Sequence, residues 1–369
     1  MRRIFDLDLM LYRDQALGMD LSGLHVPLIT PFTADDRLDT AGLERLADDV
    51  LSAGAVGLVA LGTTGEPATL AAAEKRAVLD VCAQACADHG AMLTVGAGSN
   101  ATAATVAAVG EVDRRAGAVL VVVPYYTRPS AAGVIAHFRA VAAASPLPVI
   151  VYDVPARTGR ILGFDAVTEL AATDGVVGFK HAPGVLGDTT MRLLADRADG
   201  VAFLAGDDVT VSATLALGAD GAILASANVA PREYAALVAA WAAGRVDEAR
   251  TLGHALVPLA VALFAEPNPV VIKAVLAAQG RIASPAVRLP LLTASRAATD
   301  SALAAFAAAV WERRIGLSGT RDEPGEGSGE DPLQAGVEVD EGVAEAGVAA
   351  VQRGDRGRWG GDLVERARE

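Results

Sequence analysis

The chain has 369 residues, of which 52% are hydrophobic and only 4% aromatic, and its formal net charge is −14. This acidic balance argues against nucleic-acid binding, because the sequence offers no basic stretch that could displace counterions from phosphates. Its apolar runs are shorter than the ~18 residues that a membrane-spanning helix requires. Acidic residues interrupt the N-terminal stretch that resembles a secretory signal, so we expect a cytoplasmic protein.

Short β-branched runs recur along the chain and predict eight strands. The expected strands are 24–30, 57–61, 92–96, 119–123, 149–152, 176–180, 201–204 and 221–224. Segments of helical period separate them at 40–52, 71–87, 102–116, 131–144, 164–172, 189–195 and 210–217. Continuously apolar strands that alternate with helices predict a parallel α/β sheet covered on both faces. Eight repeats favour a closed (β/α)8 TIM barrel, although the pattern also allows an open sheet.

More helices follow the last expected strand than one barrel repeat requires, which predicts an appended C-terminal helical layer. These segments are 231–243, 246–264, 269–279 and 294–314. The expected organisation is an N-terminal extension at 1–18, a barrel at 19–243, C-terminal helices at 244–316 and an acidic tail at 317–369. The tail contains 13 acidic and 6 basic residues and few large apolar ones, so we expect it to be disordered. Met19 is an alternative start to Met1.

Lys180 ends the apolar run 175–180, where another aliphatic residue would be the ordinary choice. An ammonium taken out of water either pairs with a carboxylate or loses its proton and becomes a nucleophile that forms imines with carbonyl substrates. The alternative is a lysine whose stem packs on the strand while its head reaches solvent.

Other polar residues follow the ends of expected strands, where a barrel carries its active site. The segment Gly62–Glu66 combines Thr63 and Thr64 with backbone N–H groups, which suits a small carboxylate, although a plain glycine turn fits too. Tyr125 and Tyr126 follow the fourth expected strand and offer phenols for proton relay or for packing.

The fifth expected strand ends at Tyr152 and is followed by Arg157, a guanidinium that can grip a carboxylate or lie free at the surface. The segment Gly206–Asp208 follows the seventh expected strand. The expected barrel therefore gathers these polar groups around Lys180.

Taken together, these motifs resemble the dihydrodipicolinate synthase family of pyruvate-dependent class I aldolases and lyases. The resemblance runs in order from about residue 22 to residue 314 and rests on the segments 62–66, 124–130, 152–159, 178–180, 206–208 and 266–269.

The resemblance implies a role for each matching residue. It implies catalytic roles for Lys180, Tyr152, Thr63 and Tyr126, substrate binding by Thr64, Arg157, Gly206 and Ile223, and a place for Tyr125 at a subunit interface. The resemblance further implies that Lys180 forms an imine with pyruvate and that the resulting enamine attacks L-aspartate 4-semialdehyde in lysine and diaminopimelate biosynthesis. The lysine supplies the electron sink, so no cofactor is expected. A homotetramer built from two dimers is also implied.

Two other functions remain open from the residues. An N-acetylneuraminate-lyase-like or 2-keto-3-deoxy-sugar-acid aldolase would share Lys180 and Tyr152 but would take a polyhydroxylated aldehyde, which the cationic Arg157 suits less well. A non-catalytic barrel would require Lys180 to be inert. No metal site is expected, because Cys82 and Cys86 lie at a helical packing spacing without further ligands nearby.

The chain also departs from the pattern of this family. His181 stands where an acidic residue is usual, Asp153 replaces a commoner Asn, and Pro183 stiffens the following loop. We expect His181 to be a packing or supporting residue, because it alternates to the side of the strand opposite Lys180. The positions that bind feedback lysine in some family members correspond here to Ala72, Lys75 and Ala104, which predicts weak or absent inhibition by lysine.

Overall fold

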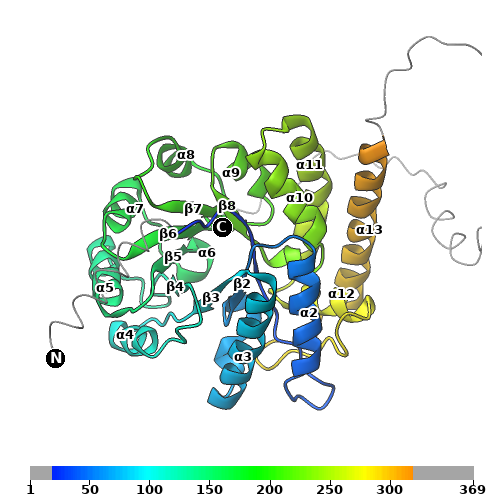
Figure 1. Cartoon of the computed structure of the whole chain (residues 1–369), viewed down its shortest axis with the longest axis horizontal. Coiled ribbons are helices and arrows are strands. Elements are labelled where there is room, and N and C mark those ends of the chain that lie inside the picture. Colours follow the sequence, from blue (N-terminus) through cyan, green and yellow to red (C-terminus); the bar gives the residue numbers. More distant parts are fainter. Residues whose placement is uncertain (1–18, 319–369) are drawn as a thin grey trace, which may run out of the picture. The chain divides into compact units, whose positions relative to one another are not determined.

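Eight parallel strands form a closed barrel in the computed structural model, which describes residues 19–318 (Figure 1). The strands are β1 (Gly23–Pro27), β2 (Gly57–Ala60), β3 (Met92–Gly96), β4 (Ala118–Val122), β5 (Val149–Asp153), β6 (Val176–His181), β7 (Ala202–Ala205) and β8 (Gly221–Ile223). Each strand pairs with the next, and β1 pairs with β8 to close the ring. The expected barrel is confirmed, and the open sheet is excluded.

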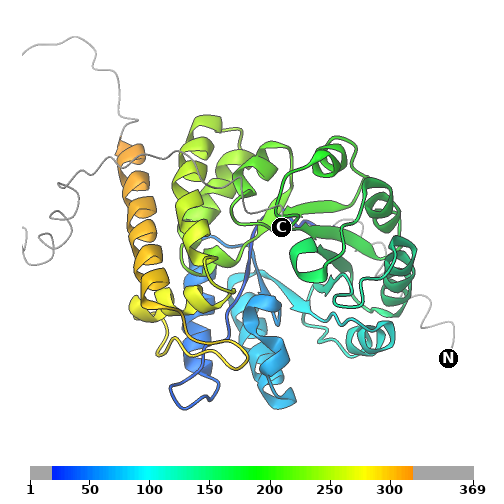
Figure 2. The same ribbon diagram turned by 180° about the vertical axis from the view of Figure 1, so that it is seen from behind.

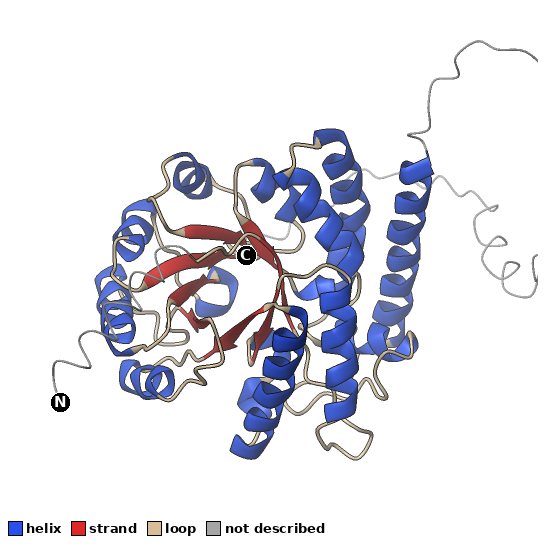
Figure 3. Cartoon of the chain, in the orientation of Figure 1, coloured by secondary structure: helices blue, strands red, loops and turns tan. Residues whose placement is uncertain are grey.

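Helices surround this ring of strands on the outside (Figure 3). They are α2 (Thr40–Ser52), α3 (Ala72–His89), α4 (Thr102–Gly110), α5 (Ala131–Ala144), α7 (Phe164–Ala171), α8 (Asp188–Ala195), α9 (Val211–Ala216) and α10 (Pro231–Ala242). The short α6 (Pro155–Thr158) follows β5 and is seen within the ring in this view. Side-chain caps mark where some of them begin. The Asp39 carboxylate accepts a hydrogen bond from the Gly42 N–H at 2.9 Å, and the Ser130 hydroxyl accepts one from Gly133 at the start of α5.

Three helices beyond the barrel form the expected C-terminal layer: α11 (Val246–Leu263), α12 (Val270–Ala278) and α13 (Arg296–Ser318). Helix α13 packs on α11 and α12, and both views show it beside them at one side of the barrel (Figures 1 and 2). The extension at 1–18 and nearly all of the tail at 317–369 lie outside the described residues. The proposed segment boundaries therefore stay a prediction.

The core has two layers, because successive side chains of a strand point to opposite faces. One layer fills the barrel interior and includes Ile150, Tyr152, Leu204 and Ile223. The other lies between the strands and the helices and includes Val151. Two neighbouring residues at the carboxyl end of a strand therefore point in opposite directions, one into the barrel interior and the other towards the helices.

Between residues 19 and 318, no helix combines the length and the apolar character needed to cross a membrane. The same residues contain no group of three or more His, Cys, Asp or Glu side chains placed to hold a metal ion. Cys82 and Cys86 are buried in the core as free thiols, and burial raises the pKa of Cys86 to about 11.

Candidate active site

Lys180 lies near the carboxyl end of β6, and its side chain is buried, with 7% of its surface exposed. Its Nζ atom lies 4.3 Å from the centre of the Tyr152 ring. The two residues are register partners on β5 and β6, which places their side chains next to each other inside the barrel. A buried amine thus meets a phenol ring at the barrel face where active sites form.

Gly206 and Ile223 belong to the same cluster at the barrel mouth. A Cβ atom added to Gly206 would lie 2.8 Å from Cγ of Lys180, so the glycine leaves room for the stem of that lysine. Ile223 is 1% exposed and lies in the interior layer together with Tyr152. Gly206 therefore adjoins the lysine stem, and Ile223 belongs to the interior layer that contains Tyr152.

The segment 63–65 forms a tight 3-10 turn directly after β2. The Thr64 side chain is buried, and its Oγ1 accepts a hydrogen bond from Nδ2 of Asn268 at 3.0 Å. The carbonyl of Gly65 accepts another from the Thr30 hydroxyl at 2.7 Å. Thr63 is exposed. These two hydrogen bonds hold the turn in place on its buried side. The hydroxyl of Thr63 stays accessible to a ligand.

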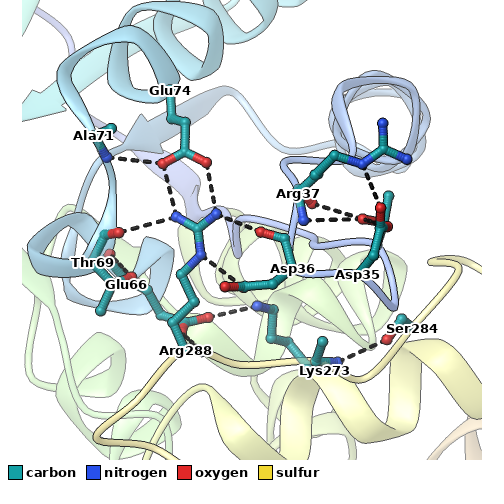
Figure 4. Close-up of polar contacts among 12 residues, drawn as sticks. Asp35, Asp36, Arg37, Glu66, Thr69, Ala71, Glu74, Lys273, Ser284 and Arg288 are labelled. Atoms are coloured by element: carbon teal, nitrogen blue, oxygen red, sulfur yellow. Dashed lines mark hydrogen bonds and ion pairs between the residues drawn. The ribbon is translucent and has the colours of Figure 1, made fainter.

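A buried ion pair follows this turn (Figure 4). Nζ of Lys273, which belongs to α12, lies 2.6 Å from Oε1 of Glu66, and both side chains are almost completely buried. Burial lowers the pKa of Lys273 to about 8, and the Glu66 carboxylate opposes that shift. The backbone N–H of Arg288 donates to the other Glu66 oxygen at 3.0 Å. Glu66 has a left-handed backbone with a φ of 52°, an uncommon conformation that these bonds help to hold.

The Arg288 side chain joins a second set of acceptors beside this pair (Figure 4). Its two terminal nitrogens each donate to one oxygen of Glu74, at 2.8 and 2.7 Å. This bidentate contact is the main reason that the pKa of Glu74 falls to about 2. The Arg288 Nε donates to Asp36 at 2.9 Å, and the guanidinium lies 4.2 Å from the centre of the Phe32 ring. The C-terminal layer is thus tied to the loops after β1 and β2.

Asp208 is a buried carboxylate after β7, and its Oδ1 accepts the backbone N–H of Ser226 at 2.6 Å. Burial raises its pKa to about 6, while the bonds to Ser226 and the nearby charge of Lys180 act in the opposite direction. The carboxyl group is therefore half protonated at about pH 6, where an ordinary aspartate is ionised.

Besides Thr63, three expected site residues lie at the surface of the single chain. Tyr125 and Tyr126 are 39% and 88% exposed, and Tyr126 has a φ of 68°. Arg157, in α6, is exposed as well. The structure therefore brings Lys180, Tyr152, Gly206 and Ile223 together and leaves Tyr126 outside that cluster within one chain.

The sequence analysis assigned no role to Asn268 or Lys273, although it noted the segment 266–269. The signal that drew attention to Lys180 also applies to Lys273, because this lysine interrupts the apolar run 270–276 of α12. It is completely buried. Asn268 gives no comparable signal, since its partner Thr64 lies about 200 residues away in the sequence.

The fold and this cluster define a class: a (β/α)8 barrel with a buried lysine and a tyrosine side by side at the carboxyl ends of adjacent strands. Residues 20–309 match the model of the dihydrodipicolinate synthetase family. The chain is 40% identical to the 4-hydroxy-tetrahydrodipicolinate synthase of Moorella thermoacetica over 284 residues, which cover 76% of this chain and 95% of that protein. The chain belongs to the dihydrodipicolinate synthetase family.

Solved structures agree with this assignment. The 4-hydroxy-tetrahydrodipicolinate synthase of Methylacidiphilum fumariolicum matches with a TM-score of 0.76 and 31% identity, covering 81% of this chain and 99% of that one. The chloride-inhibited dihydrodipicolinate synthase of Acinetobacter baumannii, complexed with pyruvate, matches with a TM-score of 0.75 and 32% identity, covering 79% and 99%. The expected family is confirmed.

Proposed function

We propose that this chain acts as a 4-hydroxy-tetrahydrodipicolinate synthase, a lyase that condenses pyruvate with L-aspartate 4-semialdehyde in lysine and diaminopimelate biosynthesis. The observation that carries the proposal is the buried Lys180 beside Tyr152, in a chain whose relatives bear that name. A related structure holds pyruvate, the substrate that an imine-forming lysine requires.

The chemistry begins at the amine of Lys180. The neutral amine attacks the ketone carbon of pyruvate, water leaves, and an imine forms. Loss of a proton from the pyruvate methyl group gives an enamine, whose carbon bonds to the aldehyde carbon of the semialdehyde. The amino group that came from the semialdehyde then attacks the imine carbon. This attack closes the ring and releases Lys180. Tyr152 is the nearest phenol to the lysine and therefore the proposed group for moving protons in these steps.

The turn at 63–65 is the proposed site for the carboxylate of pyruvate. It follows β2 at the carboxyl face of the barrel and carries the accessible hydroxyl of Thr63. Thr64 is held in place by Asn268 at the back of the turn. A turn fixed in this way presents N–H and hydroxyl donors to an anion without a large ordering cost.

The role of Tyr126 is proposed to require a second subunit. An 88% exposed aromatic side chain with a left-handed backbone is unusual for a free surface. Entry of this phenol into a neighbouring site, beside Tyr125, would bury it and complete the proton relay with Thr63 and Tyr152. We therefore propose a homotetramer made of two dimers, acting in the cytoplasm.

The sugar-acid aldolase is the competing function, and substrate assays separate the two. The proposal predicts product formation from pyruvate with aspartate 4-semialdehyde and none with N-acetylmannosamine or a sugar aldehyde. Replacing the exposed Arg157 by Ala should raise KM for the semialdehyde, because the guanidinium binds its carboxylate. Turnover of the sugar aldehyde in preference to the semialdehyde would contradict the proposal. Lysine should inhibit weakly or not at all, since Ala72 and Ala104 offer no polar side chain.

A further inference from the structure

Asp153 and His181 form a buried pair directly next to the two residues at the centre of the site. They follow Tyr152 and Lys180 in sequence and are the next register partners along β5 and β6. Nδ1 of His181 lies 3.1 Å from Oδ2 of Asp153, and the two residues are 6% and 2% exposed. Because successive side chains alternate in direction, the pair lies between the strands and the helices, while Lys180 and Tyr152 face the barrel interior.

The ring of His181 also contacts helix α8. Its Nε2 lies 2.9 Å from the hydroxyl of Thr190 in the first turn of that helix. A carboxylate only accepts, so Nδ1 carries the hydrogen of the first bond, and in a neutral ring Nε2 accepts the hydroxyl of Thr190. Within residues 19–318, the other Asp153 oxygen is buried without a hydrogen-bond partner. The histidine is thus the side chain that holds this carboxylate.

Both residues are departures from the pattern noted in the sequence, and the structure shows that the two departures touch each other. The structure shows one buried carboxylate, on β5, held by a histidine on the neighbouring strand β6.

We propose that Asp153 and His181 are a positioning pair that sets the placement of Lys180 relative to Tyr152. This inference rests on the proposed function. The pair joins the carboxyl ends of β5 and β6 side by side, where backbone bonds also continue the sheet from Ala182 to Asp153 and from Gly206 to His181. A shift of one strand end would alter the 4.3 Å separation between the amine and the phenol ring. The proposed pyruvate-carboxylate site lies on a different strand, so the pair acts on kcat more than on KM.

The test is a double-mutant cycle measured by steady-state condensation kinetics. Asp153→Asn should lower kcat by about fivefold and His181→Glu by about fiftyfold, because the second change places two buried carboxylates together. KM for pyruvate should change by less than about twofold in each variant. The double variant Asp153→Asn/His181→Glu again pairs one buried carboxylate with a side chain that can donate a hydrogen bond to it, so its kcat should return to within about threefold of wild type.

A matched control removes a partly buried histidine–threonine hydrogen bond elsewhere. His137→Gln breaks the 3.0 Å contact with Thr102 on the outer helices and should leave kcat unchanged. If His181→Glu alone does not fold, the double variant must still fold and turn over. The inference is overturned if the wild type is active and the double variant is no better than His181→Glu, or if both single variants match wild type. A wild type that traps no pyruvate contradicts the proposed function instead.

Discussion

The amine of Lys180 lies 4.3 Å from the centre of the Tyr152 ring, which belongs to an interior layer that also contains the aliphatic Leu204 and Ile223. The ring covers one side of the nitrogen, and Gly206 packs against the stem of the lysine. The amine is thereby held beside the phenol ring near the carboxyl end of β6. In the proposed reaction the amine forms the imine and the phenol moves protons, so the two roles belong to different side chains.

Tyr152→Phe should separate these two roles. The variant keeps the ring over Lys180 but lacks the hydroxyl, so the imine with pyruvate should still form while kcat for condensation falls by about 10²-fold. Borohydride trapping and steady-state kinetics on the same variant measure the two effects. An unchanged kcat would show that the phenol of Tyr152 moves no proton in the reaction.

Asn268→Ala should weaken pyruvate binding. The change removes the N–H donor to Thr64 and frees the turn at 63–65, so KM for pyruvate should rise by about tenfold, which corresponds to the loss of one hydrogen bond. Gln279→Ala is the control, because Gln279 lies at the end of α12 in the same helical layer. Among the described residues, its side-chain nitrogen and oxygen have no hydrogen-bond partner. Equal KM values for the two variants would contradict the role given to Asn268.

Lys273→Met should destabilise the fold strongly. The change leaves the Glu66 carboxylate buried without its cation, and loss of one partner of a buried pair costs about 3–5 kcal/mol of unfolding free energy. Adding Glu66→Gln should recover part of that loss, because the buried charge disappears. Urea denaturation measures both changes. Arg37→Met breaks the exposed pair with Asp35 and should change the free energy of unfolding little. If Lys273→Met and Arg37→Met lowered the free energy of unfolding equally, burial would not explain the importance of the Lys273 pair.

Asp208 predicts a specific dependence of stability on pH. Its pKa is raised to about 6 in the folded state, so between pH 4 and pH 6 the folded chain holds a proton that the unfolded chain releases. The resulting stabilisation is fully present below about pH 4 and is lost as the pH rises through 6, a change of roughly 3 kcal/mol. Asp208→Asn should abolish this part of the pH dependence. If the free energy of unfolding, measured by urea denaturation, changed with pH in the same way for wild type and variant, the raised pKa of Asp208 would be contradicted.

The barrel could be predicted from local sequence because each strand is a short apolar run between helical segments. All eight expected strands are present, with ends that differ from the expectation by a few residues, as at β1, which ends at Pro27 instead of Thr30. The position of Lys180 at the end of β6 followed from the same pattern. These features depend on residues close together in the chain, which local periodicity can report.

Contacts between distant segments could not be predicted in this way. Lys273 pairs with Glu66 across some 200 residues, and no local pattern marks a lysine as the partner of one particular glutamate. His181 was expected to support or pack, on strand parity alone, and its bond to Asp153 emerged only when the register of β5 and β6 was known. The roles assigned to the site residues, those of Lys180 and Tyr152 included, stay predictions. Thr63, Tyr126 and Arg157 are exposed in the single chain.

The most direct test of the account is the intact mass of the protein after incubation with pyruvate and borohydride, for wild type and for Lys180→Ala. The account predicts a reduced pyruvyl adduct on the wild type, located on Lys180 by peptide mapping, and no adduct on the variant. The same adduct on both proteins, or none on the wild type, would contradict the assignment of Lys180 as the imine-forming residue.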